Sequence, residues 1–189
     1  MRRITFDIET ANDFADLFEP AKLDLALICI HDSETDSYSS YRVEELPKLW
    51  PILEKADVLI GYNSDHFDIP VLGKYYPGDL TKIRSLDLLK EVRNVLGRRL
   101  KLDNLCQATL GAQKSGDGAQ AVRWWREGKV EKVRAYCLND VRLTKELYDY
   151  ALKNGTLKYK DFDGVRDIKL DTSHWEKGEG NALTHTLPF

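Results

Sequence analysis

The sequence predicts an α/β fold in which a mixed β-sheet is flanked by helices. Three observations predict this class: an opening run of strand-like segments, a strand, helix, strand succession that ends near residue 61, and a second half dominated by helical patterns. The chain has 189 residues, which is enough to bury one core without disulfides or a structural metal. We therefore expect a domain of medium size.

The first part of the chain has the residue alternation of β-strands. Turn-forming residues at positions 32–34 separate the second strand from the third, which indicates an antiparallel meander. The three strands are expected at residues 2–9, 23–30 and 35–43.

A helix and a fourth strand are expected next. Residues 44–56 have helical spacing of apolar side chains, although Pro47 suits only a first turn and Pro51 would disturb the middle. The apolar run at residues 57–61 is typical of a buried parallel strand, so a strand, helix, strand crossover follows.

Helical patterns fill the second half of the chain, and glycine ends three of the four expected helices. Residues 156–171 alternate around Asp163 and Gly164 as a hairpin would, and a polar, glycine-bearing tail follows from residue 176. The helices are expected at residues 85–97, 101–111, 119–129 and 130–155.

Composition excludes several classes of protein. Cys29, Cys106 and Cys137 are far apart and form no C-x-x-C pair, so neither a disulfide framework nor a zinc site is expected. No segment approaches the roughly 20 consecutive apolar residues of a membrane span, and the first residues run straight into a strand instead of a signal peptide. We expect a cytoplasmic protein without a membrane partner.

The net charge of -3 argues against a uniformly basic surface for nucleic acid. The charge is uneven, however, because residues 98–134 hold nine Lys and Arg against four acidic residues. That local surplus suits a groove that follows a phosphate backbone, and it suits the solvated faces of several helices equally well.

The first chemical pattern is a pair of carboxylates on the first strand. Asp7 and Glu9 are two residues apart, so both side chains leave the same face of the strand. The same spacing recurs at Asp32 and Glu34, where a solvated turn is a sufficient explanation. Asp7 and Glu9 differ because they interrupt an apolar strand that should be central, where acids are costly unless they are paired or bound to metal.

Two further patterns carry acidic residues. Asp68 follows the fourth strand and sits just inside the next helix, where helix capping would account for it alone. Tyr136 and Asp140 are four residues apart in a helix and therefore lie on one face. A lone tyrosine at this spacing is more often part of a core than catalytic.

These strings, in this order, resemble the three sequence motifs of the DEDD superfamily of 3′-to-5′ exonucleases, and above all the proofreading domains of family B DNA polymerases. FDIET is similar to the first motif, GYNSDHFD to the second and YCLND to the third, and the resemblance covers residues 3–150. Tyr136 stands four positions before Asp140, whereas the histidine subfamily would place His at position 135, which is Ala. The resemblance is therefore to the tyrosine subfamily, DEDDy, and His66 is interpreted as an ordinary loop residue.

The resemblance implies a ribonuclease H-like fold, with a mixed five-stranded sheet flanked by helices and the first strand at its centre. The fifth strand is expected as a short piece near residues 81–85. The ribonuclease H-like exonuclease domain would span residues 1–155. Residues 156–189 would form a C-terminal appendage, hairpin-like and then a polar tail.

Four carboxylates in one place raise one another's pKa and resist ionisation unless cations bind. Oxygen ligands favour Mg²⁺ or Mn²⁺, and two ions about 4 Å apart can hold the attacking and leaving oxygens of a phosphodiester. By similarity, Asp7 would bridge both ions, Glu9 and Asp140 would complete the site that activates water, and Asp68 would hold the second ion. Tyr136, with a phenol pKa near 10, is expected to orient the attacking water.

The resemblance implies removal of nucleotides from a 3′ end. Strand ends must fray to enter such a site, so single strands or 3′ overhangs of DNA or RNA are expected, with DNA slightly favoured. A polymerase or a helicase is the expected protein partner. Trp124 and Trp125 suit stacking on a strand, although at least one Trp can equally belong to the core. Six residues are expected to contact the nucleic acid: Thr10, Asn63, Phe67, Arg98, Arg99 and Lys101.

Other functions fit the same patterns. A non-catalytic module that binds nucleic acid on the same fold would keep the groove without turnover, but every motif position is filled. An RNA-trimming nuclease or an endonuclease would use the same phosphodiester chemistry. A protein-interaction domain would leave the carboxylates without a purpose.

Overall fold

A computed structural model describes residues 1–12, 19–112 and 118–177. Lys114 of the basic segment and the polar tail from residue 178 onward lie outside the described residues.

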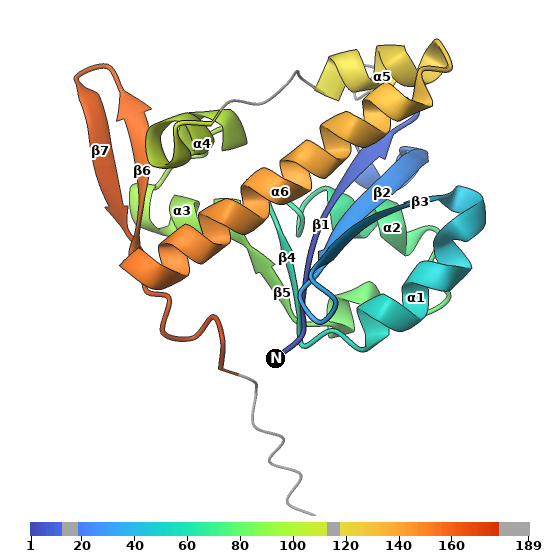
Figure 1. The fold of residues 1–189 in the computed structure, drawn as a ribbon, viewed down its shortest axis with the longest axis horizontal. Coiled ribbons are helices and arrows are strands. Elements are labelled where there is room, and N and C mark those ends of the chain that lie inside the picture. The colour runs from blue at the N-terminus through green and yellow to red at the C-terminus, as the bar shows by residue number, and fades with distance from the viewer. Residues whose placement is uncertain (13–18, 113–117, 178–189) are drawn as a thin grey trace, which may run out of the picture.

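The centre of the molecule is a five-stranded mixed sheet (Figure 1). β1 (Arg3–Thr10) pairs antiparallel with β2 (Leu25–Asp32), which pairs antiparallel with β3 (Ser37–Arg42). On its other side β1 runs parallel to β4 (Val58–Gly61), and β4 runs parallel to β5 (Ser85–Asp87). The order β3-β2-β1-β4-β5 confirms the expected mixed sheet with a central first strand.

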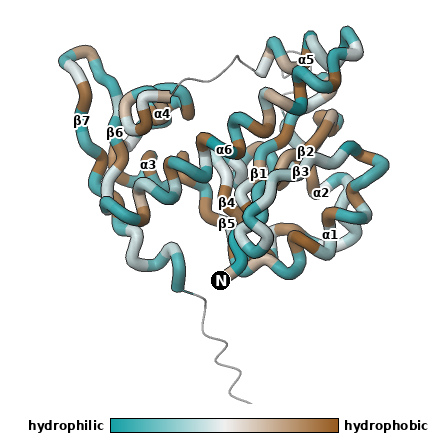
Figure 2. Tube along the Cα trace, in the orientation of Figure 1, coloured by the Kyte–Doolittle hydropathy of each residue, from teal (hydrophilic) through white to brown (hydrophobic). Residues whose placement is uncertain are grey.

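Helices cover both faces of this sheet. α1 (Leu46–Glu54) and α2 (Asp68–Gly73) bury their apolar residues in one cluster with Phe6 and Ile8 of β1. The long α6 (Val130–Asn154) crosses the other face (Figure 1), where Val133, Cys137 and Val141 pack against Leu27 and Cys29 of β2. Figure 2 shows hydrophobic residues, in brown, along the central strands and at intervals along the helices that cover them.

The register of β1 and β2 decides which face carries the acidic residues. Asp7 lies opposite Cys29, and Glu9 lies opposite Leu27. Because directly opposed residues of an antiparallel pair share a face, Asp7 and Glu9 point to the side of the sheet that α6 covers. The same alternation sends Phe6 and Ile8 toward α1 and α2.

The second half adds helices and a hairpin beyond the parallel edge of the sheet. α3 (Leu88–Leu96) and α4 (Leu102–Leu110) pack with the hairpin of β6 (Thr156–Asp161) and β7 (Gly164–Lys169). Leu157, Ile168 and Trp175 are buried in one cluster with side chains of α3, α4 and α6. The ring of Trp175 stacks on Tyr148 of α6 with centroids 5.4 Å apart, so the hairpin region and α6 share a core.

α5 (Gly118–Arg126) precedes α6 and lies beside its first turns (Figure 1). Gly97, Gly111 and Gly155 adopt positive φ angles just after α3, α4 and α6, which confirms the glycine ends expected from the sequence. Three 3₁₀ turns complete the described structure: Pro20–Lys22, Val43–Glu45 and Leu80–Lys82.

Several strands and helices begin or end a few residues away from the expectation, and two of these differences have a clear physical cause. The fifth strand was expected near residues 81–85, but Asp79 accepts a hydrogen bond from the backbone N–H of Thr81 at 3.0 Å and starts a 3₁₀ turn there. β5 therefore begins at Ser85. α3 begins at Leu88 instead of Ser85, because Asp87 caps it by accepting from the backbone N–H of Leu89 at 2.9 Å.

α1 continues through Pro51 as an unbroken helix, with Pro47 in its first turn. None of the helices in the described ranges has both the length and the apolar character needed to cross a lipid bilayer.

Candidate metal centre and nucleic-acid cleft

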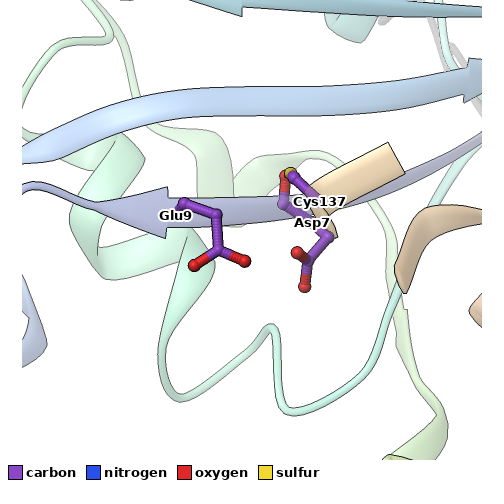
Figure 3. A group of neighbouring side chains, drawn as sticks. All are labelled: Asp7, Glu9 and Cys137. Atoms are coloured by element: carbon purple, nitrogen blue, oxygen red, sulfur yellow. The ribbon is translucent and has the colours of Figure 1, made fainter. Parts of the chain in front are cut away.

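Asp7 and Glu9 form the floor of a cleft at one end of β1. Figure 3 shows their carboxylates leaving the same side of the strand. Glu9 is 7% exposed, so its charge is largely removed from water. Ile8, between them, is buried on the opposite face and holds the strand in this orientation.

Asp68 comes to the same cleft as the first residue of α2. It is 4% exposed, and its Oδ1 accepts a hydrogen bond from the backbone N–H of Ile8 at 3.2 Å. β4 pairs with β1 only from Arg3 to Thr5, so this contact lies beyond the last paired residue. Asp68 thereby ties α2 to β1 between the two acidic residues of the strand.

The charge state of Asp68 reflects this burial. Loss of water, together with the negative charges of Asp87 and Asp140, raises the pKa of Asp68 to about 7, although the hydrogen bond from Ile8 lowers it. A buried carboxylate with other carboxylates nearby is costly to ionise, and a bound cation would reduce that cost.

Asp140 and Tyr136 reach the cleft from α6, one helical turn apart. Both are 3% exposed. The ring of Trp124, on α5, meets the ring of Tyr136 edge to face, with centroids 6.4 Å apart and an interplanar angle of 72°. Trp124 is half-buried and Lys132 lies 5.9 Å from its ring centroid, while Arg42 lies 5.9 Å from the ring centroid of Trp125.

The five predicted catalytic residues therefore line one cleft, with a volume of about 370 Å³. Backbone and side chains from β1, α2, α5 and α6 form its walls. The lining consists of Asp7, Ile8, Glu9, Thr10, Tyr62, Asn63, Phe67, Asp68, Gly118, Ala119, Val122, Tyr136 and Asp140.

Cys137 lies next to the carboxylate pair, and its Sγ is within 4.8 Å of ligand atoms of Asp7 and Glu9. The thiol donates a hydrogen bond to the backbone oxygen of Asp7 at 3.3 Å. Burial, the neighbouring Cys29 and the charges of Asp7 and Glu9 raise the pKa of Cys137 well above its usual value, so the sulfur stays protonated in the absence of a metal. The donors that remain are carboxylate oxygens, a set that fits Mg²⁺ or Mn²⁺ better than Zn²⁺.

The loop before α2 is held by a residue that the sequence did not single out. Asp87 is 5% exposed and accepts hydrogen bonds from the backbone N–H groups of Asn63 at 2.7 Å, Asp65 at 3.2 Å and Leu89 at 2.9 Å. Burial raises the pKa of Asp87 despite these hydrogen bonds. Asn63 has a φ of 66°, a left-handed conformation that the loop needs in order to turn toward Asp68.

Asp87 was missed because it was placed inside an expected helix. A cap residue between a short strand and a helix was the available signal.

The six residues expected to contact nucleic acid are not all in one place. Thr10, Asn63 and Phe67 line the cleft. Arg99 donates a hydrogen bond to Oδ1 of Asn63 and so reaches its rim.

The other two lie outside the cleft lining. Arg98 forms an ion pair with Asp161 at 3.3 Å and lies over the ring of Tyr159. Lys101 lines a different surface hollow, together with Arg99.

Comparisons with known proteins agree with this architecture. Residues 4–152 match the family model of the RNase H superfamily. Among solved structures, the chain is similar to a family B DNA polymerase from the hyperthermophilic archaeon Pyrobaculum calidifontis, with a TM-score of 0.62 and 17% identity. The match covers 80% of this chain and 24% of the polymerase chain, and at this identity it shows a likeness of fold alone. A search of the curated proteins finds no match.

Proposed function

The chain belongs to the RNase H superfamily, and from this premise we propose that it is a metal-dependent 3′-to-5′ exonuclease that hydrolyses phosphodiester bonds of single-stranded nucleic acid or 3′ overhangs. DNA is the slightly favoured substrate over RNA. The observation that carries the proposal is the convergence of Asp7, Glu9, Asp68, Asp140 and Tyr136 in one cleft.

Each of these side chains has a proposed role. Asp7, Glu9, Asp68 and Asp140 would hold two Mg²⁺ or Mn²⁺ ions. When bound, the ions would lower the pKa of water and stabilise the negative charge that develops on the phosphate oxygens. Without cations, four carboxylates this close together would oppose one another's ionisation. The pKa of Asp68 is raised first by burial and then by the charges of Asp87 and Asp140, which agrees with such opposition.

Tyr136 would position the attacking water and would not act as the base. A phenol with a pKa near 10 is a weak base at neutral pH, so its hydroxyl is suited to orient the attacking water through a hydrogen bond. The edge-to-face contact with Trp124 restricts the tilt of the Tyr136 ring, which supports such a role.

Thr10, Asn63 and Phe67 would contact the terminal nucleotide, because they line the same cleft as the carboxylates. Phe67 offers a ring for base stacking, and Asn63 offers an amide. Lys101 and Arg98 would act farther along the strand, because both lie outside the lining of the cleft. A polymerase or a helicase is the proposed protein partner, and a family B DNA polymerase carries a similar fold in about a quarter of its own chain.

The test is a time course with 5′-labelled single-stranded DNA and RNA of one sequence, in Mg²⁺, Mn²⁺ or EDTA. We expect a metal-dependent ladder that shortens from the 3′ end and is lost in Asp7→Ala. Glu34→Ala is the matched control, because Glu34 belongs to the second D-x-E pair, and its side chain is 63% exposed. Equal activity of Asp7→Ala and the wild type would overturn the proposal.

The second candidate is a binding module without turnover. The filled motif positions disfavour it. Binding of both strands with no products under any metal condition would support it and would reject the exonuclease.

A further inference from the structure

A second cavity opens beside the catalytic cleft, on the other side of Asn63. Its volume is about 730 Å³, against about 370 Å³ for the cleft, and Asn63 lines both. A volume of this size is within the range of sites that hold small organic ligands. We call it the α3 cavity, lined by Asn63, Asp65, His66, Asp87, Leu89, Lys90, Arg93, Asn94, Gly97 and Arg99.

The lining of the α3 cavity carries three basic residues, Lys90, Arg93 and Arg99, against two acidic residues, Asp65 and Asp87. The segment around it is basic in an acidic protein, because residues 84–101 contain six Lys and Arg and two acids, whereas the whole chain has a net charge of -3. Both acids of this segment already accept hydrogen bonds. Asp87 accepts three backbone N–H groups, and Glu91 accepts from the indole N–H of Trp175 at 3.3 Å.

The basic side chains of the cavity differ in what they already bind. Lys90 forms an ion pair with Asp65 at 3.2 Å, and Arg99 donates to Oδ1 of Asn63. Arg93 makes neither an ion pair nor a side-chain hydrogen bond with any residue in the part of the chain that the structure describes. Its guanidinium is a planar donor that suits the oxygens of a phosphate.

Asn63, which separates the cleft from the α3 cavity, is held in place by two hydrogen bonds. The backbone N–H of Asn63 is held by Asp87 at 2.7 Å, and its side-chain oxygen is held by Arg99. A strand whose last nucleotide lies in the cleft can therefore cross one defined edge, at Asn63, and continue toward Arg93.

We propose that the α3 cavity binds a phosphate of the strand upstream of the scissile bond, with Arg93 as its main ligand. This inference rests on the proposed exonuclease function and deepens it, because a phosphate site outside the cleft favours a strand of several nucleotides over an ester of one nucleotide. The positive charge of Arg93 and the neighbouring amide of Asn94 supply the recognition.

The test removes one positive charge from the α3 cavity. Arg93→Gln is compared with Lys48→Gln, because Lys48 is an exposed residue of α1 that lines neither cavity. Binding of a fluorescent single-stranded decanucleotide is followed by anisotropy in EDTA over a range of salt concentrations. Loss of one phosphate contact reduces the slope of log Kd against log salt by about 0.7 for a single strand. A ten-fold rise in salt should therefore weaken binding about five-fold more in the wild type and in Lys48→Gln than in Arg93→Gln.

A second variant adds a negative charge to the α3 cavity and leaves its positive charges in place. Asn94→Asp places a negative charge in the cavity without removing a cation, and it should raise the Kd for the decanucleotide above that of Lys48→Gln at low salt. In Mg²⁺, the ratio of kcat/KM for the decanucleotide to kcat/KM for the p-nitrophenyl ester of thymidine 5′-monophosphate should fall in both cavity variants.

The outcomes separate the two proposals. The same Kd and salt slope in Arg93→Gln and Lys48→Gln would overturn the α3 cavity as a phosphate site, even if metal-dependent cleavage is observed. Absence of cleavage with a reduced slope in Arg93→Gln would overturn the exonuclease and keep the strand-binding cavity.

Discussion

The carboxylate of Asp68 accepts a hydrogen bond from the backbone N–H of Ile8 at 3.2 Å, and this contact joins the two halves of the proposed metal centre. Ile8 separates Asp7 from Glu9 on β1, and Asp68 opens α2. The third acidic residue is therefore positioned by the backbone of the strand that carries the first two. The arrangement concentrates charge, and several consequences can be measured.

The first consequence concerns stability against pH without metal. The folded chain raises the pKa of Asp68 to about 7, from 3.8 in the unfolded chain. Between these values the folded state holds a proton that the unfolded state lacks, so Asp68 stabilises the fold at low pH and this contribution is lost as the pH rises toward and through about 7.

Asp68→Asn should remove that loss, because an amide carries no charge and still offers an oxygen to Ile8. In EDTA its Tm should equal or exceed that of the wild type at pH 8, with a gain of a few kcal/mol at most in the free energy of unfolding. The advantage should shrink toward pH 4. Parallel curves of Tm against pH for the two proteins would contradict a raised pKa at Asp68.

Divalent metal should stabilise the protein by relieving the same repulsion. At an ion concentration one hundred times the Kd, the gain is about 2.7 kcal/mol for one site. For a chain of this size that corresponds to a rise in Tm of roughly 5–10 °C. Differential scanning fluorimetry with Mn²⁺ measures it, with Asp7→Ala as the variant that should lose most of the shift and Glu34→Ala as the control that should keep it.

Tyr136→Phe should lower the rate of hydrolysis without weakening the binding of metal. The substitution removes only the hydroxyl, so the ring keeps its contact with Trp124 and the carboxylates keep their places. We expect kcat to fall about a hundredfold, as for other positioned hydrogen-bond donors, with little change in the Kd for Mn²⁺. Unchanged kcat in Tyr136→Phe would remove Tyr136 from the mechanism.

Asp87→Ala should displace the loop that carries Asn63, although Asp87 itself does not line the cleft. It leaves the N–H groups of Asn63, Asp65 and Leu89 without their acceptor, which costs about 2–3 kcal/mol through the lost helix cap and the buried donors. The conservative Asp87→Asn keeps an acceptor oxygen and should recover part of both the Tm and the activity.

Asp79→Ala is the control for Asp87, because Asp79 caps a 3₁₀ turn and lines neither the cleft nor the α3 cavity. It should leave kcat/KM for an oligonucleotide close to the wild-type value, whereas Asp87→Ala should lower it. Equal kcat/KM in the two alanine variants would show that Asp87 supports only the stability of the fold.

The sequence predicted the central features of the fold because they depend on local patterns. Alternation along residues 2–9 and 23–30 indicated the strands, and the two-residue and four-residue spacings of Asp7 with Glu9 and of Tyr136 with Asp140 indicated shared faces. The parallel edge strand was harder, since Ser85 to Asp87 is short and continues directly into α3.

Long-range contacts could not be predicted from local patterns. Asp87 accepts a hydrogen bond from the backbone of Asn63, which lies 24 residues earlier in the chain. Arg99 donates a hydrogen bond to the side chain of Asn63, and this contact depends on how α3 packs against β4. Arg98, counted with Arg99 in the same basic segment, turns instead to Asp161 of the hairpin. Adjacent residues with the same charge thus have different surroundings, which only the tertiary structure decides.

The carboxylates of Asp7, Glu9, Asp68 and Asp140 are proposed to form one site for two divalent ions. Bound Mn²⁺ can be counted by electron paramagnetic resonance at pH 8, with thymidine 5′-monophosphate present as the reaction product. We expect two ions per wild-type chain and loss of that binding in Asp7→Ala, with Glu34→Ala unchanged. Binding of Mn²⁺ that is the same in the wild type and Asp7→Ala would contradict the claim.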